Sequence, residues 1–229
     1  MSGKRREAVE EMLRAVDKDM QETAAMTGRR TLSPAVRDAL RAVARHQFTR
    51  PIDAGSAYEN RPLPIGHGQT ISQPYIVALM SELLDLPADA KSSARLLEIG
   101  AGCGYQTAVL GELAREIFAV EIVPALARTA EERLARLGYR NVAIRAGDGA
   151  LGWPEQAPFD GIIVAAVAPS APPALMRQLK AGAKLVIPLG HAGGAQNLTV
   201  ITRASDASVR ENRILPVAFV PFTGVKPQS

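Results

Sequence analysis

From residue 74 to residue 189 the chain alternates between short apolar runs and longer segments in which apolar residues recur at helical spacing. The apolar runs predict strands at 95–99, 117–121, 141–145, 161–166 and 183–189. The segments between them predict helices at 74–85, 104–115, 124–137 and 171–179. Strands joined by helices of this length form a parallel sheet with right-handed crossovers. The alternation therefore predicts a three-layer, doubly wound α/β fold around a mostly parallel sheet.

The two ends of the chain depart from this alternation. Residues 198–202 and 209–220 predict strands with no helix between them, so we expect the sheet to finish with antiparallel strands. Near the other end, apolar residues at helical spacing predict an amphipathic helix over 4–22. Ser33 followed by Pro34 is a start signal for a second helix. We therefore expect a helical cap at the N-terminal end of the chain.

Charge and composition narrow the class of protein. The net charge is +4, with 11 Lys and Arg against 7 Asp and Glu in residues 1–50 and 16 against 16 in the remainder. Because the basic excess lies in the N-terminal segment and aromatic residues make up only 4% of the chain, a nucleic-acid surface is not favoured. Cys103 is the single cysteine, which is typical of a reducing compartment, and no run approaches the roughly 18 apolar residues of a membrane span. We expect a soluble, cytoplasmic protein without nucleic-acid or membrane partners.

A glycine-rich turn follows the first predicted strand, at Gly100, Gly102 and Gly104. In a doubly wound fold this turn is where a nucleotide-like ligand binds. A dinucleotide fingerprint requires glycine at position 105, where Tyr105 stands. Glu98, two residues before the turn, would repel an anionic pyrophosphate and attract the ammonium and sulfonium groups of S-adenosyl-L-methionine. The turn is typical of a methyltransferase, with a simple tight turn as the alternative.

Two further acids follow the next strands in order. Glu121 ends the second strand, 21 residues after Gly100, where enzymes that bind an adenosine cofactor keep an acid for the ribose hydroxyls. Asp148 follows the third strand between two glycines and can accept a hydrogen bond from the adenine amino group. A strand-end acid alone is usually solvated. In this order on successive strands, however, the acids predict a Rossmann-like methyltransferase that uses S-adenosyl-L-methionine.

Residues 48–74 hold four prolines and three glycines, which predicts a loop with room for short strands. Within this loop, 63–74 reads Leu-Pro-Ile-Gly-His-Gly-Gln-Thr-Ile-Ser-Gln-Pro, which resembles the signature of the protein-L-isoaspartate O-methyltransferases. The likeness runs from about residue 34 to the tail and includes 98–107, 147–149, 157–160, 173–175, 178–179, 187–190 and 219–222. The chain departs from the family's pattern at Ala44, Thr49 and Ala218, and residues 1–30 have no clear counterpart in it.

The resemblance implies a repair enzyme that methylates the α-carboxylate of L-isoaspartyl residues in damaged peptides and proteins. The methyl donor would be S-adenosyl-L-methionine, leaving S-adenosyl-L-homocysteine, and the ester would start repair through a succinimide. The resemblance implies that Ser72 is the active-site residue and that the cofactor contacts are Ile71, Ser72, Gln73, Pro74, Glu98, Gly100, Gly102, Glu121, Asp148, Gly149 and Thr223. We divide the chain into a helical cap with a substrate loop at 1–73 and the methyltransferase domain at 74–229.

This reaction makes few further demands on the chain. A carboxyl group with a reference pKa near 4 is already ionised at pH 7, so its methylation needs no general base. The histidines His46, His67 and His191 form no base-and-orienter pattern, and no cluster of His, Cys or acidic residues predicts a metal site. We therefore expect catalysis to come from desolvation and alignment of the carboxylate.

Several alternatives stay open. Ser72 can instead be only the N-cap of the helix that opens at Pro74, and His67 fits a turn role better than a substrate contact. Trp153 fits a packing anchor better than a binding platform. The closest rival function is methylation of ordinary aspartates in a dedicated peptide substrate. A rival from another class is a catalytically silent module that binds S-adenosyl-L-methionine and uses its basic N-terminal helix as an adaptor.

Overall fold

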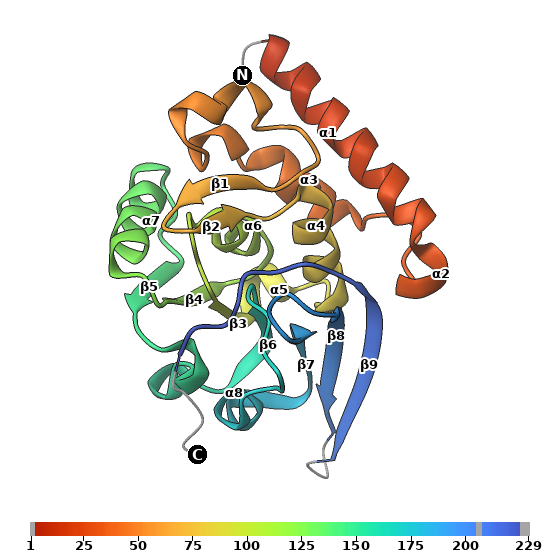
Figure 1. Cartoon of the computed structure of the whole chain (residues 1–229), viewed down its shortest axis with the longest axis vertical. Coiled ribbons are helices and arrows are strands. Elements are labelled where there is room, and N and C mark those ends of the chain that lie inside the picture. Colours follow the sequence, from red (N-terminus) through yellow and green to blue (C-terminus); the bar gives the residue numbers. More distant parts are fainter. Residues whose placement is uncertain (1–2, 205–207, 225–229) are drawn as a thin grey trace.

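The computed structural model describes residues 3–204 and 208–224. Its centre is a seven-stranded sheet with the strand order β5-β4-β3-β6-β7-β8-β9 (Figure 1). The strands are β3 (Arg95–Ile99), β4 (Glu116–Glu121), β5 (Val142–Ala146), β6 (Phe159–Val164), β7 (Leu179–Gly190), β8 (Gln196–Arg203) and β9 (Val209–Pro216). Strands β3 to β7 pair in parallel, whereas β8 and β9 join antiparallel. This topology confirms the predicted doubly wound α/β fold with an antiparallel end.

Helices cover the two faces of the sheet and form a cap on one side of the molecule (Figure 1). They are α1 (Gly3–Glu22), α2 (Ala24–Thr27), α3 (Pro34–Ala42), α4 (Pro74–Leu83), α5 (Ala90–Ser93), α6 (Tyr105–Leu113), α7 (Pro124–Arg136) and α8 (Pro173–Gln178). A separate hairpin, β1 (Leu63–Gly66) and β2 (Gln69–Ile71), lies between the cap and the sheet. None of the helices in the described ranges combines the length and the hydropathy needed to cross a membrane.

The N-terminal helices follow the local signals in the sequence. Ser33 Oγ accepts a hydrogen bond from Val36 N at 3.3 Å, and Pro34 opens α3. Helix α1 buries one apolar stripe, which consists of Val9, Met12, Leu13, Val16 and Met20. This stripe belongs to the same core as the buried residues of α3, α4 and α6. The division of the chain at residue 73 stays a prediction.

Two local predictions differ from the structure, and one short helix was not predicted. The last strand was expected over 209–220 but ends at Pro216, because the chain then leaves β8 and crosses the sheet, where Val167 N donates to Val220 O at 2.9 Å. The helix expected over 171–179 is the shorter α8. Strand β7 starts at its end, because Leu179 already pairs with Phe159 of β6. The short helix α5 lies in a stretch for which the sequence predicts no element.

The core has two parts, one on each face of the sheet. Leu96 of β3 belongs to the larger part beneath α4, α6 and α7, whereas Leu97 belongs to the part beneath α8. The second part includes Phe118, whose ring meets the Trp153 ring edge-on with centroids 5.5 Å apart. The Arg145 guanidinium covers Trp153 at 4.4 Å from the ring centroid. Trp153 is therefore a packing anchor, as the sequence indicates.

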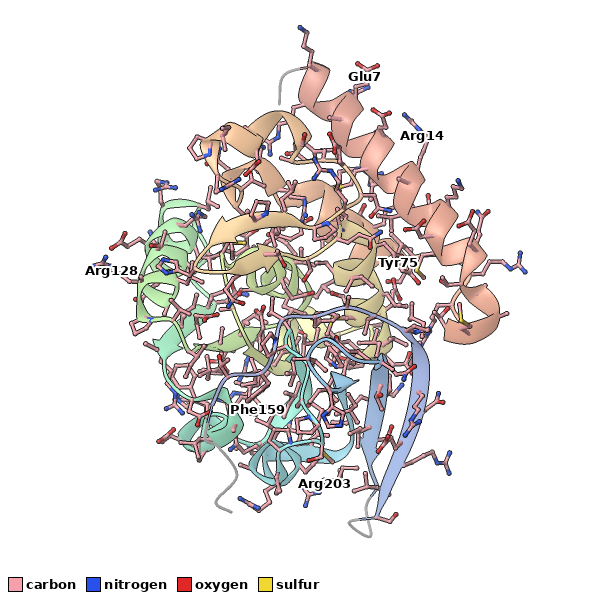
Figure 2. All side chains as sticks on the ribbon, viewed as in Figure 1. Glu7, Arg14, Tyr75, Arg128, Phe159 and Arg203 are labelled. Atoms are coloured by element: carbon pink, nitrogen blue, oxygen red, sulfur yellow. The ribbon has the colours of Figure 1, made fainter. Side chains whose placement is uncertain are left out.

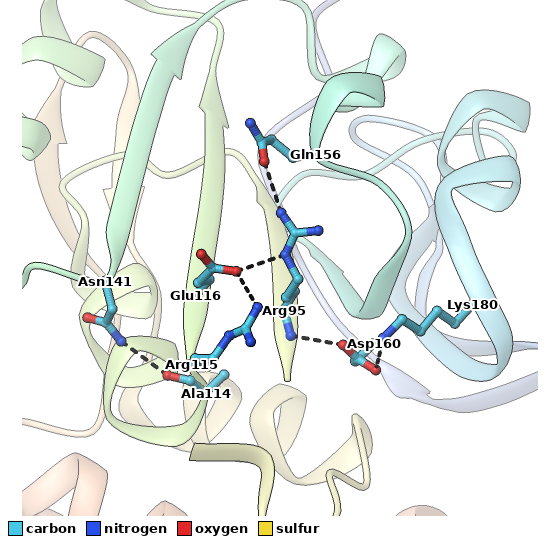
Figure 3. Close-up of polar contacts among 8 residues, drawn as sticks. All are labelled: Arg95, Ala114, Arg115, Glu116, Asn141, Gln156, Asp160 and Lys180. Atoms are coloured by element: carbon cyan, nitrogen blue, oxygen red, sulfur yellow. Dashed lines mark hydrogen bonds and ion pairs between the residues drawn. The ribbon is translucent and has the colours of Figure 1, made fainter. Parts of the chain in front are cut away.

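A polar cluster ties together the amino ends of the central strands (Figure 3). Arg95 Nε donates to Glu116 at 2.9 Å, and Arg95 Nη2 donates to Gln156 at 2.9 Å. The backbone N–H of Arg95 donates to Asp160, whose second oxygen accepts from Lys180 Nζ at 2.7 Å. These contacts hold β3, β4, β6 and β7 at one end. The opposite, carboxyl ends of the strands are where the cavity described next lies.

Candidate active site

A cavity of about 600 Å³ lies over the carboxyl ends of β3, β4 and β6. In doubly wound folds a ligand binds at these ends, where the strand order reverses. The lining comes from the last turn of α1, from 69–73, from 98–103, from Glu121 and Ile122, from Gly149 and from the tail 215–223. Its charged side chains, among the described residues, are all acids, namely Asp19, Glu22, Glu98 and Glu121. The cavity therefore suits a ligand that carries positive charge.

The glycine turn has the geometry that its sequence predicts. Gly100, Gly102 and Gly104 have φ angles of 87°, 54° and 88°, in the left-handed region that favours glycine. A Cβ atom on Gly104 would also lie 3.1 Å from the Leu134 side chain, so α7 packs closely against this turn. Helix α6 begins at Tyr105, which is buried, so the position that a dinucleotide fingerprint reserves for glycine holds a core residue.

Glu98 is a buried acid that faces the cavity. Its side chain is fully buried, and neither carboxyl oxygen has a hydrogen-bond partner within the described residues. Burial is the main cause that raises the pKa of Glu98 to about 8; the nearby Thr107 hydroxyl acts against this rise, and the charge of Glu121 adds to it. A buried carboxyl group without donors is unfavourable, so an ammonium group that enters the cavity would gain a hydrogen bond and an ion pair with Glu98.

Glu121 has a structural role as well as a place in the cavity. Its Oε2 accepts a hydrogen bond from Gly102 N at 2.7 Å, and its Oε1 accepts one from Val123 N at 2.9 Å. Each oxygen keeps a second lone pair, so hydroxyl groups of a ligand can still donate to it. Glu121 is therefore not a solvated strand end, because it ties β4 to the glycine turn.

The third predicted acid lies differently. The Asp148 side chain is not part of the cavity lining; its Oδ1 accepts from Ala150 N at 2.8 Å and caps the 3₁₀ turn Gly149–Leu151. Gly149 does line the cavity, and a Cβ atom there would lie 2.2 Å from Ile99 Cγ2, which leaves no room for a side chain. The contact between Asp148 and adenine stays a prediction.

Ser72 follows the hairpin and lines the cavity. Its hydroxyl makes no hydrogen bond within residues 3–204 and 208–224, and the N-cap position of α4 is held by Gln73. The alternative in which Ser72 only caps this helix is therefore wrong, because the helix begins one residue too late for it. His67 has a φ of 53° at the tip of the hairpin, which agrees with a turn role.

The comparisons with known proteins agree on one family. A family model described as protein-L-isoaspartate(D-aspartate) O-methyltransferase matches residues 18–227. Protein-L-isoaspartate O-methyltransferase 2 of Syntrophobacter fumaroxidans is 48% identical over 213 residues, which cover 93% of this chain and 85% of that protein. The Nitrosococcus oceani protein of the same name is 49% identical over 93% of this chain and 95% of its own length. The chain belongs to the protein-L-isoaspartate O-methyltransferase family.

Solved structures support the same fold. A protein-L-isoaspartate O-methyltransferase structure superposes with a TM-score of 0.77 at 25% identity, over 92% of this chain and 66% of that chain. A Plasmodium falciparum structure described by the same activity, in complex with S-adenosyl-L-homocysteine, superposes with a TM-score of 0.74 over 92% of this chain and 98% of its own. The predicted family, fold and methyltransferase class are therefore confirmed.

Most of the residues that the family resemblance implies meet in this cavity. Those that line it are Ile71, Ser72, Gln73, Glu98, Gly100, Gly102, Glu121, Gly149 and Thr223. Pro74 and Asp148 do not line it. Pro74 occupies the first turn of α4 and so sets where that helix starts. Within the described ranges, no group of three or more His, Cys, Asp or Glu side chains is arranged to hold a metal ion.

Sequence reasoning missed the contribution of α1 to the protein-L-isoaspartate O-methyltransferase cavity. Asp19 Oδ2 accepts hydrogen bonds from Asn60 Nδ2 at 2.9 Å and from Gln73 Nε2 at 3.1 Å. Thr23 Oγ1 and the Tyr75 hydroxyl are 2.6 Å apart, and Tyr75 lies beside the C-terminal half of α1 (Figure 2). The helical spacing identifies the apolar face of α1, but only its docking shows which polar residues reach the cavity.

Proposed function

We propose that this cavity holds S-adenosyl-L-methionine together with an L-isoaspartyl residue of a damaged protein, and that Ser72 aligns the carboxylate to be methylated. The reaction is that of the family, methylation of the isoaspartyl α-carboxylate, which starts repair through a succinimide. The observation that carries the proposal is Glu98, a buried carboxyl without partners in a cavity whose charged lining is acidic. This charge pattern suits a cofactor with two cationic groups.

The residues present fit this cofactor. Glu98 would pair with its ammonium group, and Glu121 would accept hydrogen bonds from the ribose hydroxyls. Gly149 packs so closely against Ile99 that only its backbone borders the cavity, so no side chain there blocks a ligand. The hydrogen bond from the adenine amino group to Asp148 and the cofactor contact of Pro74 remain part of the proposal. When bound, S-adenosyl-L-methionine supplies an electrophilic methyl group on a sulfonium centre.

The chain itself has to hold the substrate carboxylate and exclude water. The carboxylate is ionised at pH 7, so no residue needs to take a proton from it. Ser72 offers a hydroxyl donor without another partner among the described residues, and Ala218 lies in the tail segment that lines the same cavity. Because no Lys, Arg or His of the described chain lines the cavity, neutral donors must hold the carboxylate. We expect rate enhancement from alignment and desolvation.

A labelling experiment tests the function. The protein is incubated with S-adenosyl-L-methionine labelled in the methyl group and with two peptides that differ only in an aspartyl or an isoaspartyl linkage. We expect labelling of the isoaspartyl peptide, with an ester that is lost in mild base as a succinimide forms. Equal labelling of both peptides would favour the alternative, methylation of ordinary aspartates in a dedicated substrate. Binding of the cofactor without labelling of either peptide would favour a silent binding module.

The Ser72→Ala variant tests the catalytic assignment. Loss of one hydrogen bond to a charged group costs about 1.5–3 kcal/mol, so kcat should fall roughly ten- to a hundred-fold with little change in cofactor affinity. Ser92→Ala is the matched control, since that serine is exposed and its hydroxyl bonds only to Asp89 O near α5. A Ser72→Ala variant with the kcat of the wild type would remove Ser72 from the reaction.

We further propose that the enzyme works in the cytoplasm on isoaspartyl peptides and proteins, and that it binds neither nucleic acid nor membranes. The buried free thiol of Cys103 supports a reducing compartment. The acidic lining of the cavity would repel a polyanion such as a nucleic acid. Cell fractionation with detection of the protein tests the location, and enrichment in the membrane pellet or in a periplasmic extract would contradict it.

A further inference from the structure

A fully buried arginine lies behind the substrate loop. Arg45 is 0% exposed and opens a short 3₁₀ turn, Arg45–Gln47, after α3. Its Nε donates to Ala57 O at 2.8 Å, and its Nη2 donates to Ser72 O at 2.8 Å and to Arg61 O at 3.4 Å. All three acceptors are backbone carbonyls of the segment that leads into and out of the hairpin. One side chain thus spans the loop that carries Ser72.

The positive charge of Arg45 faces backbone carbonyls rather than a carboxylate. No carboxylate among the described residues forms an ion pair with its guanidinium, and its Nη1 has no hydrogen-bond partner there. Burial lowers the pKa of Arg45, but a guanidinium keeps its proton at any pH that proteins tolerate. Burial of an uncompensated charge is costly, so the carbonyls must stay in place around it. The arginine therefore favours a single arrangement of the loop.

Arg45 also contacts the glycine-turn side of the cavity. Its guanidinium carbon lies 4.7 Å from the centroid of the Tyr105 ring, a cation–π distance. Tyr105 is the first residue of α6, directly after Gly104, and it lines the cavity. The same side chain thus joins the loop that presents Ser72 to the helix that follows the glycine turn.

We propose that Arg45 is a positioning residue for methyl transfer, which holds the backbone of Ser72 in register with the glycine turn so that the serine hydroxyl meets the substrate carboxylate. This inference rests on the proposed role of the cavity. Arg45 does not line the cavity, so it acts through Ser72 and Tyr105 rather than on the substrate. Displacement of a reacting group by about 1 Å can slow a reaction about a hundred-fold, so a loosened loop should be seen in kcat.

Arg45→Lys is the main variant, because lysine keeps the charge but loses the planar fork that reaches separate carbonyls and stacks on a ring. Arg95→Lys is the matched control. Arg95 also stacks on an aromatic ring, at 5.1 Å from the Phe118 centroid, and donates to Glu116, but at the amino ends of the strands (Figure 3). Both variants are assayed with the isoaspartyl peptide, and their affinity for S-adenosyl-L-homocysteine is measured by calorimetry.

We expect Arg45→Lys to lower kcat roughly ten- to a hundred-fold with cofactor affinity within about twofold of the wild type, and Arg95→Lys to leave kcat unchanged. In Arg45→Ala, added guanidinium ion at millimolar concentration should restore part of the rate. Wild-type kcat in Arg45→Lys would overturn the inference. It would also be overturned if both Arg45→Lys and Arg45→Ala failed to fold and lost cofactor binding, because Arg45 would then be needed for folding as a whole. Failure of the wild-type enzyme to label the isoaspartyl peptide would instead refute the proposed function.

Discussion

Replacement of Glu98 by glutamine tests the electrostatic basis of the site. Burial raises the pKa of Glu98 from 4.5 to about 8, so the folded protein holds a proton there at pH 7 that the unfolded chain has released. Between these two pKa values the folded state binds more protons than the unfolded state. The free energy of unfolding therefore falls as pH rises through this window. At 1.36 kcal/mol per pKa unit, the ionisation of Glu98 in the unfolded chain should lower the free energy of unfolding of the ligand-free protein by about 3 kcal/mol at pH 7, relative to a pH at which Glu98 is protonated in both states.

The Glu98→Gln variant should remove this dependence. The amide has nearly the same shape and does not titrate, so the variant should gain stability relative to the wild type as pH rises from 5 to 8, and differ little near pH 4.5. Urea unfolding at four pH values measures the difference. Glu116→Gln is a suitable control, because Glu116 is half exposed and hydrogen bonding to Arg115 lowers its pKa, so no divergence is expected above pH 5. Parallel curves for wild type and Glu98→Gln would refute the assigned pKa and with it the buried, unpaired state of Glu98.

The same group should couple cofactor binding to pH. An ammonium group placed beside Glu98 favours the ionised carboxylate, so binding of S-adenosyl-L-homocysteine near pH 7 should release a proton and become tighter up to about pH 8. Calorimetry in two buffers of different ionisation enthalpy counts the proton. Glu98→Gln should bind more weakly and release none. A wild-type protein that releases no proton would contradict the pairing.

Three further outcomes follow from the geometry. Glu121→Ala should weaken binding of S-adenosyl-L-homocysteine by about 1.5–3 kcal/mol, measured by calorimetry, because it removes a charged acceptor and frees Gly102 N; unchanged affinity would contradict it. Asp19→Ala should raise KM for the isoaspartyl peptide with cofactor affinity intact, because Asn60 and Gln73 lose their shared acceptor. Asp19→Asn should keep most of the activity, and equal kinetics in the wild type and both variants would rule out this role. EDTA should leave the rate unchanged, and a rate restored by added Mg²⁺ or Zn²⁺ would reveal a metal requirement.

The sequence alone determined the features that depend on neighbouring residues. The alternation of apolar runs and helical segments predicted the parallel sheet, since side-chain periodicity is set by the local backbone. The glycine turn with Glu98 and Glu121 could be placed at the carboxyl ends of adjacent strands, because parallel strands joined by right-handed crossovers bring these ends together. The run at 63–74 identified the family and hence the reaction.

Only the tertiary structure decided which side chains meet around the substrate loop. Asp19 bonds to Gln73, which is more than fifty residues away in the sequence, and Arg45 bonds to Ser72, which is twenty-seven residues away. No local sequence pattern predicts either contact. The Asp148 carboxylate caps its own turn rather than lining the cavity, although Asp148 follows the third parallel strand as predicted. A hydrogen bond between distant segments depends on how helices and loops dock, and docking is set by the packing of the whole core rather than by the spacing of residues along the chain.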